Sequence, residues 1–521
     1  MKTQMPYTSA KTDISKNNNN SITTLAHTEN TLSQCPHLPH FPHRTCTISL
    51  FLPHTYPSTK THEMKKFSIL ISLLLLITLI LAFSKDDEPA KPIYIPPSEQ
   101  RPGDAAKGYD YLTTGDFLKS GVPYNLFIMK SGKDETNYLG RSGKNANVEQ
   151  GYNVVRTADS IDIVIPTCLQ CHAQVFEGKL VLGLGNSFKD FSHITEQKAN
   201  NASIKFLQAT APRQYNAFKS FYRSYVTVNP YLETDIRGIN PADKLAAVLV
   251  AHRDPQTLKW SDDPYLDIPT DVVPTDVPPW WLLRKKNAMF YNAFGRGDFG
   301  RFLMLSNLLT VADTTEANEV YSHFGDVFAY IRSLEPPKYT HPINKKLAAE
   351  GELIFMDNCR ACHGTYGADA FYPNLIVPGC IIQTDSMLFK SNQQNKPFID
   401  WFNKSWFAQG SNPAKLVPSD GYIAPPLDGI WITAPYFHNG SVPTIEAVLN
   451  SKLRPKYWSR DFENPEYDYQ HLGWKYETKD KPEPKKTYNT TMPGYGNYGH
   501  YFGDHLSDKE RKALIEYLKT L

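Results

Sequence analysis

The longest apolar stretch of the chain lies near its N-terminus, directly behind charged residues. Residues 67–83, FSILISLLLLITLILAF, carry no charge and follow Met64 and two lysines. A basic start, an apolar centre and small residues before a cleavage point are the parts of a secretory signal. We therefore expect a signal peptide over residues 64–84, cleavage before Lys85, and a mature protein that is periplasmic or secreted.

The residues before Met64 show no apolar periodicity, and they hold an Asn17–Asn20 tract and six of the 16 histidines. Because a secretory signal stands at the start of a protein, we interpret residues 1–63 as a mis-called N-terminal extension and expect it to be disordered. The alternative is an internal membrane span behind a disordered cytoplasmic tail, for which about 17 residues is short. No cysteine stands directly behind the apolar run, so a lipoprotein is not indicated. Membrane contact is therefore expected only through the signal segment, if it stays uncleaved.

Two further patterns predict helices in the C-terminal third of the chain. Residues 345–357 place apolar side chains at helical spacing and lead directly into Cys359. Near the end, Ser507 stands where a helix N-cap is expected, with Glu510 as its capping-box partner. The apolar positions of these two helices are Leu347, Ala348, Leu353, Ile354 and Phe355 in the first and Leu514, Ile515 and Leu518 in the second.

The composition is that of a globular chain. Of the 521 residues, 41% are hydrophobic and 21% charged, which excludes wholesale disorder, a collagen-like repeat and a polytopic membrane protein. The 39 prolines and 12% aromatic residues indicate a loop-rich, aromatic-rich chain. The net charge is +2 and no basic stripe stands out, so no nucleic-acid partner is expected.

Four of the seven cysteines lie in two identical frames, Cys168-x-x-Cys171-His172 and Cys359-x-x-Cys362-His363. Two thiols at this spacing on one turn can add to both vinyl groups of a haem, and the histidine that follows can bind the iron as its proximal ligand. We therefore predict two covalently bound haem c groups. A zinc site would need four ligands at finger-like spacing, and a thioredoxin-like pair would not require the histidine in both copies. Cys35 and Cys46 would be lost with residues 1–84, and the remaining Cys380 is expected to be a buried, inert thiol.

The linker Glu335–Lys338, which contains two prolines, divides the chain between the two frames. We expect an N-terminal haem domain over residues 85–337 and a class I cytochrome c-like domain over residues 338–521. The helical stretch that ends at Leu334 resembles the closing helix of a first cytochrome-like unit. The N-terminal domain is longer than one haem requires, so its surplus should build a pocket. The predicted fold is mainly α, with two cytochrome c-like haem domains, extensive loops, and an enlarged N-terminal domain.

The second haem has three candidates for its distal ligand, His500, Met492 and His438, and an open iron is the remaining alternative. A small cytochrome takes this ligand from the loop before its last helix, and His500 is nearest to that helix. Two histidine ligands generally make a haem low-spin, with a lower potential than a His/Met pair, and suited to electron transfer. His438 can alternatively lie at the haem edge as a hydrogen-bond partner.

No comparably placed distal ligand is evident for the first haem. His252 closes an amphipathic helix, where the helix dipole explains it, and a methionine in an apolar context is more often core packing than a ligand. We therefore expect a five-coordinate first iron with an apolar distal face, which can bind dioxygen or peroxide. The other residues considered were His193, His323, Met289 and Met304.

Residues 424–444, APPLDGIWITAPYFHNGSVPT, together with the two frames, resemble the di-haem cytochrome c peroxidase and MauG superfamily. Residues 278–303, PPWWLLRKKNAMFYNAFGRGDFGRFL, with SLEPPKY at 333–339 and the ending at 498–521, are similar to its RoxA-type, rubber oxygenase-like branch. The likeness covers most of residues 100–521.

The resemblance implies roles for particular residues. In that branch the N-terminal haem binds oxygen with a phenylalanine beside the ligand, which corresponds to Phe294 here. A tryptophan near the haems corresponds to Trp280 or Trp281, and the bis-His C-terminal haem corresponds to His500. The alternative interpretation of Phe294 and the two tryptophans is core packing.

Two classes of function remain open on the sequence. The first is an oxidoreductase of the oxygenase or peroxidase type, which uses dioxygen or peroxide, an apolar organic substrate and redox partner proteins. The second is a non-enzymatic periplasmic electron-transfer cytochrome with both haems six-coordinate. The long surplus around the first frame favours the enzyme, since a carrier needs only a small shell.

Overall fold

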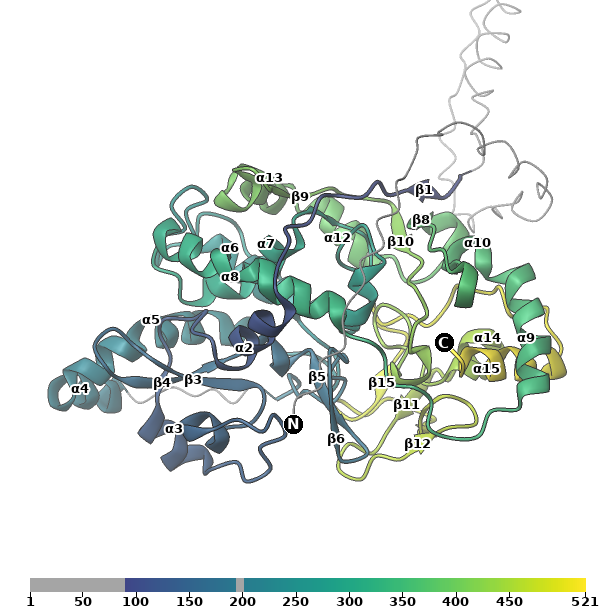
Figure 1. Cartoon of the computed structure of the whole chain (residues 1–521), viewed down its shortest axis with the longest axis horizontal. Coiled ribbons are helices and arrows are strands. Elements are labelled where there is room, and N and C mark those ends of the chain that lie inside the picture. Colours follow the sequence, from purple (N-terminus) through teal and green to yellow (C-terminus); the bar gives the residue numbers. More distant parts are fainter. Residues whose placement is uncertain (1–89, 194–200) are drawn as a thin grey trace, which may run out of the picture. The chain divides into compact units, whose positions relative to one another are not determined.

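The computed structural model of this protein describes residues 90–193 and 201–521 (Figure 1). The predicted extension and signal peptide lie outside the described residues. Residues 91–521 belong to one unit by their internal contacts. In the described ranges, no helix is both long enough and apolar enough to cross a membrane.

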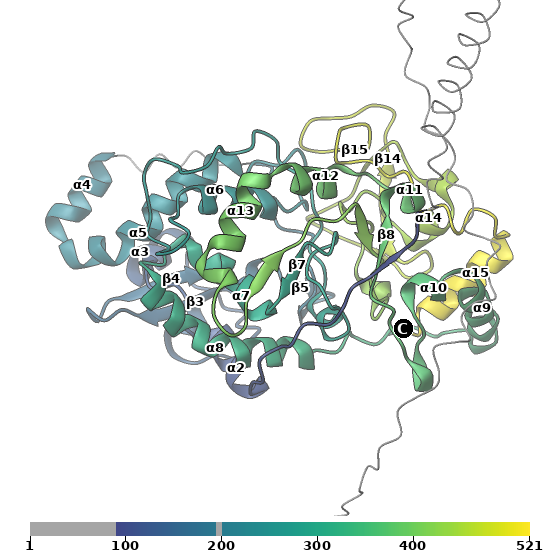
Figure 2. The same ribbon diagram turned by 90° about the horizontal axis from the view of Figure 1, so that it is seen from above.

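Two pairs of packed helices stand out, one in each half of this unit. In the N-terminal half, α2 (Ala105–Thr114) packs against α8 (Thr314–Ser333). In the C-terminal half, α9 (Lys345–Asn358) packs against α15 (Asp508–Leu518), as Figure 2 shows. The predicted helix before Cys359 is thus confirmed as α9. The capping box is also confirmed, because the Ser507 side chain accepts from the Glu510 amide while the Glu510 carboxylate accepts from the Ser507 amide.

Each helix pair meets at a glycine. A Cβ atom on Gly108 of α2 would lie 1.9 Å from the carbonyl oxygen of Asp326 in α8, and a Cβ on Gly351 of α9 would lie 1.9 Å from that of Ala513 in α15. Only glycine permits such a close approach of two backbones. Both glycines follow two alanines and one charged residue in the sequence. The two halves therefore share a local device for crossing their helices.

Small sheets and further helices complete the N-terminal half. A three-stranded sheet of order β2-β4-β3 precedes the first frame, and the β5–β6 hairpin follows it directly. The elements are β2 (Val122–Pro123), α3 (Tyr124–Ser131), β3 (Tyr152–Arg156), β4 (Asp162–Pro166), β5 (Ala173–Phe176), β6 (Lys179–Leu182), α4 (Asn201–Thr210), α5 (Pro212–Val228), α6 (Ala242–Ala251), the 3-10 helix η4 (Trp280–Arg284), β7 (Gly295–Gly297) and α7 (Phe299–Leu303).

The C-terminal half has the same mixed character. Its elements are β8 (Leu375–Pro378), α10 (Arg360–His363), α11 (Gly379–Ile382), α12 (Met387–Gln394), α13 (Lys396–Lys404), β9 (Ala414–Leu416), β10 (Gly421–Ile423), α14 (Ile445–Leu449), β11 (Tyr457–Ser459), β12 (Tyr467–Asp468), β13 (Gly473–Trp474), β14 (Glu477–Thr478) and β15 (Tyr488–Asn489). The described fold is therefore mixed rather than clearly mainly α, and the predicted pair of haem domains stays a prediction.

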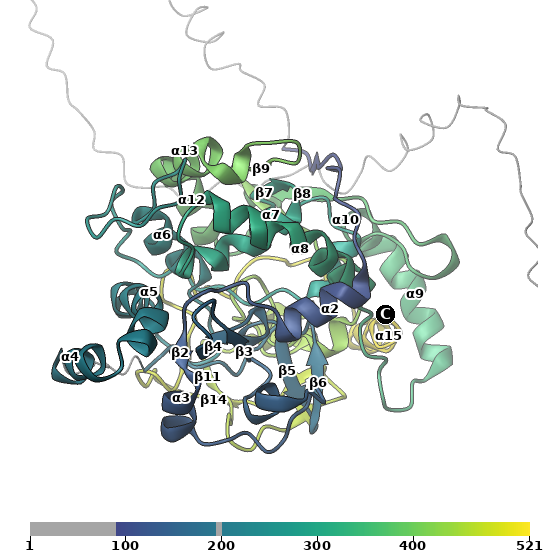
Figure 3. The ribbon, with the colours of Figure 1, turned by 60° about the vertical axis from the view of Figure 1, so that its left-hand side comes forward.

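Two sheets join segments from both sides of residue 337. In one, β1 (Ile93–Tyr94) and β10 both pair antiparallel with β8. In the other, β7 pairs antiparallel with β9, with Gly295 opposite Leu416. α13 also lies beside α6 (Figure 3). The segment from α13 to β9, which we assigned to the C-terminal domain, thus packs with the N-terminal half.

The described residues form two large apolar cores, one around each helix pair. The first surrounds α8 and takes in Trp280 and Phe294, together with Trp401 and Phe402 from α13. The second lies between α9 and α15 and takes in Trp281. Burying one aromatic side chain of this kind contributes roughly 1.5–3 kcal/mol. The adjacent tryptophans therefore belong to different cores.

Two expectations about burial were wrong. Leu353 is 68% exposed, because the face of α9 that meets α15 is formed by Ala348, Gly351 and Phe355, and position 353 lies on the far side of the helix. Cys380 is exposed rather than buried. It lies on the short helix α11, where Ile382 packs against a small core and position 380 points away from it.

Candidate functional site

The second C-x-x-C-H frame lies on the continuation of α9. The Cys359 amide donates to the Phe355 carbonyl at 2.8 Å, and the His363 amide donates to the Cys359 carbonyl at 3.0 Å. The helical turn α10 thus holds both thiols and the imidazole on one compact turn. Burial raises the pKa of Cys359 to about 12 and also raises that of Cys362, so both are neutral thiols in the unmodified chain. This geometry fits attachment of one haem through both sulfurs.

His363 is oriented by a hydrogen bond on the far side of its ring. Its Nδ1 lies 2.8 Å from the carbonyl oxygen of Pro425, and since a carbonyl only accepts, Nδ1 carries the proton. Nε2 is then the unprotonated nitrogen that can bind a metal. Burial lowers the pKa of His363, which keeps the imidazole neutral as metal ligation requires. A hydrogen bond of this kind fixes the ring orientation and strengthens the ligand.

A second imidazole faces His363. The ring centroids of His363 and His500 lie 6.3 Å apart. An iron bound about 2 Å from one nitrogen of each ring would leave the centroids about 6 Å apart. Burial lowers the pKa of His500 to about 3, and its buried Nδ1 has no hydrogen-bond partner among the described residues. The two histidines therefore fit the axial ligands of one haem iron.

The backbone around His500 is unusual. Gly499 has φ of +83° and His500 has φ of +49°, so two successive residues are left-handed. A Cβ atom at position 499 would lie 2.3 Å from the backbone of Gln383. The His500 amide donates to the Ile382 carbonyl at 2.7 Å. The loop is thus held tightly against the end of α11.

The two other candidates for the distal position lie elsewhere. Met492 packs against a separate small core that includes Trp458 and Tyr488. His438 has its Nε2 3.0 Å from the Tyr422 hydroxyl and stacks on that ring, while its carbonyl accepts from the Asp276 amide. Of the three predicted candidates, the structure brings only His500 to His363.

The first frame is built differently. It lies on a 3-10 turn, Cys168–Gln170, between β4 and β5, with the Thr167 hydroxyl accepting from the Leu169 amide at 3.2 Å. The His172 amide donates to the Cys168 carbonyl at 3.0 Å, as in the second frame. Burial raises the pKa of Cys168 to about 11 and also raises that of Cys171. The turn therefore fits haem attachment in the same way.

The surroundings of His172 are aromatic. Its ring stacks on Trp280, with centroids 4.6 Å apart and an interplanar angle of 18°. The buried Nδ1 has no hydrogen-bond partner among the described residues, and burial lowers the pKa of His172 to about 3. Phe294, 4% exposed, lies in the same core. Trp281 instead donates from Nε1 to the Asp428 carbonyl at 2.8 Å.

The other residues considered for the first haem have varied surroundings. His252 caps α6 and has Nδ1 2.9 Å from the Ser261 carbonyl, in agreement with its predicted place at a helix end. His323 stacks on Tyr111, and His193 is largely exposed beside Asp190. Met289 and Met304 are buried in the first core.

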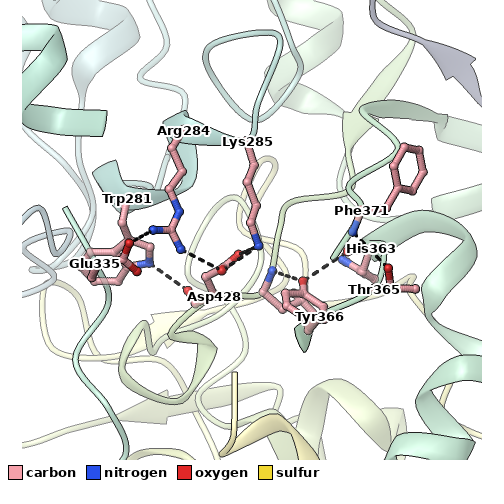
Figure 4. Close-up of polar contacts among 10 residues, drawn as sticks. Trp281, Arg284, Lys285, Glu335, His363, Thr365, Tyr366, Phe371 and Asp428 are labelled. Atoms are coloured by element: carbon pink, nitrogen blue, oxygen red, sulfur yellow. Dashed lines mark hydrogen bonds and ion pairs between the residues drawn. The ribbon is translucent and has the colours of Figure 1, made fainter. Parts of the chain in front are cut away.

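A polar cluster that the sequence reasoning missed links the 3-10 helix η4 to the loop of Asp428 beside the second site (Figure 4). Lys285 lies 2.7 Å from the Asp428 carboxylate, and Arg284 lies 3.3 Å from it and pairs also with Glu335. Lys285, which directly follows η4, is thus tied to the loop that contains Asp428. The adjoining Leu427 amide donates to the Tyr366 hydroxyl at 2.6 Å, and this hydroxyl donates to the His363 carbonyl at 3.2 Å. The signal was the basic run Arg284–Lys286, which follows two tryptophans and two leucines.

Comparison with known proteins gives one family match and two relatives. The family described as "RoxA-like, cytochrome c-like" matches residues 421–459, the segment that contains Pro425, Asp428 and His438. The protein is 30% identical over 253 residues to "Uncharacterized protein y4iJ" of Sinorhizobium fredii, which covers 36% of this chain and 41% of that protein. It is 26% identical over 292 residues to "Uncharacterized protein y4iM" of the same organism, which covers 49% of this chain and 66% of that protein.

Each alignment thus spans less than two thirds of the relative's own length. The family match supports a relationship to the cytochrome c family and a haem redox protein. It also suggests covalently bound haem c.

Proposed function

We propose that this protein is an exported di-haem c-type cytochrome in which the N-terminal haem activates dioxygen or peroxide and the C-terminal haem transfers electrons. The observation that carries the proposal is the contrast between the two proximal histidines. His363 faces a second imidazole at 6.3 Å between ring centroids, whereas His172 faces an aromatic, apolar core. Haem c, when bound, supplies an iron that exchanges electrons and, where a coordination position is open, reacts with small oxidants.

At the second site, the chain would close both axial positions. Cys359 and Cys362 would hold the group, with His363 and His500 on its two sides. The hydrogen bond from His363 Nδ1 to the Pro425 carbonyl keeps one imidazole in a fixed orientation and tautomer. A site closed in this way suits electron transfer and leaves no place for an oxidant.

At the first site, Cys168, Cys171 and His172 would hold the group, and Trp280 orients the imidazole by stacking. The core around Phe294 excludes water, so neutral small molecules such as dioxygen or peroxide, and an apolar organic substrate, are favoured there over charged ones. Electrons would come from redox partner proteins through the second site. The RoxA-like match on residues 421–459 supports this branch of the family over a simple carrier.

The decisive experiment is an EPR and absorption spectrum of the protein produced with a haem-attachment system. We expect one high-spin and one low-spin signal. His500→Ala should convert the low-spin signal to high spin and raise the potential of that haem, because a strong-field nitrogen ligand is lost. Met492→Leu is the matched control and should leave the spectrum unchanged. Two low-spin signals in the unaltered protein would instead establish the electron-transfer cytochrome with both haems six-coordinate.

A further inference from the structure

One arginine outside both frames connects the His500 loop to the neighbouring helix. Arg454 follows α14, and its guanidinium donates to three carbonyls of residues 497–500. Nη1 donates to Asn497 at 2.9 Å and to Gly499 at 2.6 Å, and Nη2 donates to the His500 carbonyl at 3.3 Å. The backbone on both sides of the His500 nitrogen is thus held by one side chain.

The same guanidinium is anchored to the end of α14. Nε donates to the Ala447 carbonyl at 2.9 Å, and Nη2 donates to the Val448 carbonyl at 3.0 Å. Carbonyls in the last turn of a helix have no partner within the helix and need one from outside. Together the two anchors and the three loop bonds engage all five N–H donors of the side chain. A lysine, with three donors at one point, cannot reproduce this arrangement.

Aromatic rings cover the faces of the guanidinium. Its central carbon lies 5.1 Å from the centroid of Phe437 and 5.7 Å from that of Tyr501. Phe437 also contacts the His500 ring, with centroids 6.0 Å apart. The nearby Asp504, which accepts from the Ser451 amide at 2.8 Å, provides the opposite charge. Arg454 is therefore held in place itself, as a residue that positions another must be.

The conformation of the His500 loop explains why the hydrogen bonds from Arg454 are needed. A histidine with φ of +49° is in a region that side chains disfavour, and it persists only where the surroundings hold it. The Ile382 carbonyl holds the His500 amide on one side. Arg454 binds the carbonyls of Asn497, Gly499 and His500. Without these bonds the loop would relax and carry the imidazole away from His363.

We infer that Arg454 is the positioning residue for the distal ligand of the second haem, and that it keeps this haem six-coordinate without touching it. The inference rests on the proposed function, because it takes His500 as an iron ligand. It assigns a role to one residue of the segment 421–459 that matches the cytochrome c-like family.

The test compares Arg454→Ala and Arg454→Lys with a matched control. Arg141 offers the control, since its guanidinium also donates to several main-chain carbonyls, but in the N-terminal half, on Thr113, Val148, Glu149 and Tyr152. Each variant is produced as the holoprotein, and haem per chain is measured together with the EPR spectrum.

We expect Arg454→Ala to lose the low-spin signal of the second haem and gain a high-spin one, with haem per chain unchanged. Added imidazole should restore the low-spin signal, because it fills the vacated position. Arg454→Lys keeps the charge and should retain a larger share of the low-spin signal than Arg454→Ala. Arg141→Lys should leave the spin states as they are.

An unchanged low-spin signal in Arg454→Ala would overturn the inference, and so would a loss that imidazole does not reverse. If Arg454→Ala does not fold, the low-spin signal of Arg454→Lys, measured with and without imidazole, tests the role of Arg454 instead. The His500→Ala variant distinguishes a wrong role for Arg454 from a wrong distal ligand. Should it open the second iron while Arg454→Ala does not, only the role of Arg454 is wrong. Should it leave the low-spin signal intact, the proposed ligand itself is wrong.

Discussion

The two attachment turns share a five-residue frame but differ in what surrounds the histidine. His363 is paired at Nδ1 with the Pro425 carbonyl and faces a second imidazole. His172 is stacked on an indole, and its buried Nδ1 has no partner among the described residues. The frame thus predicts where a haem would be attached, whereas the neighbours distinguish the two turns. One histidine faces a second imidazole, and the other stacks on an indole that belongs to an apolar core.

The same contrast appears in the packing. In both halves a glycine lets two helices cross at backbone contact. In the C-terminal half, α9 leads directly into Cys359, so the helix crossing and the haem turn form one rigid piece. In the N-terminal half, the sheet β2-β4-β3 and the helix α3 separate α2 from Cys168.

The largest effect should come from removing the thiols. Cys359→Ala or Cys362→Ala should remove the second haem and leave the first, and Cys168→Ala or Cys171→Ala should do the reverse, because each frame holds its own group. Haem per chain, measured as pyridine haemochrome, tests this expectation. A single variant that removes both groups would show that the two sites do not mature independently.

The adjacent tryptophans give a sharper comparison of the two sites. Trp280→Phe should change the spectrum of the first haem only and lower the free energy of unfolding by about 1–3 kcal/mol, because the stack on His172 shrinks. Trp281→Phe removes the Nε1 hydrogen bond to Asp428 and should spare the first haem. Absorption spectra and denaturant unfolding of both variants test this. Equal effects of Trp280→Phe and Trp281→Phe on the first haem would contradict this expectation.

The smallest expected effect concerns pH and the junction of the two regions. Asp276 donates its amide to His438, and its carboxyl accepts from Tyr291 at 3.2 Å. Burial raises the pKa of Asp276 to about 7, whereas an unfolded aspartate has a pKa of about 4. The folded state therefore holds a proton that the unfolded state releases, so this group makes stability fall as pH rises from about 4 to about 7.

Asp276→Asn should remove this dependence over that range. Melting temperatures of the protein and the variant, compared at several pH values, provide the measurement. The difference between them should change in favour of the variant as pH rises. A difference that stays constant with pH would contradict the assignment to Asp276.

Predictions that depended on neighbouring residues were the ones confirmed. The capping box of Ser507 and Glu510 and the helix before Cys359 need only residues a few positions apart. The alanine, alanine, charged residue and glycine pattern that precedes both helix crossings, at Gly108 and Gly351, could also have been recognised. Periodicity did not reveal which face of a helix would be covered. The expectations that Leu353 and Cys380 would be buried were wrong for that reason.

The sequence by itself identified the two C-x-x-C-H turns, because the spacing of two thiols and a histidine within one turn specifies their relative positions. Only the tertiary structure brought His500 rather than Met492 or His438 opposite His363. It alone placed Arg454 across the distal loop. These contacts join residues far apart in the chain. They depend on backbone hydrogen bonds and packing that no single residue type specifies, so the sequence favoured His500 only by its place before the last helix and by the resemblance.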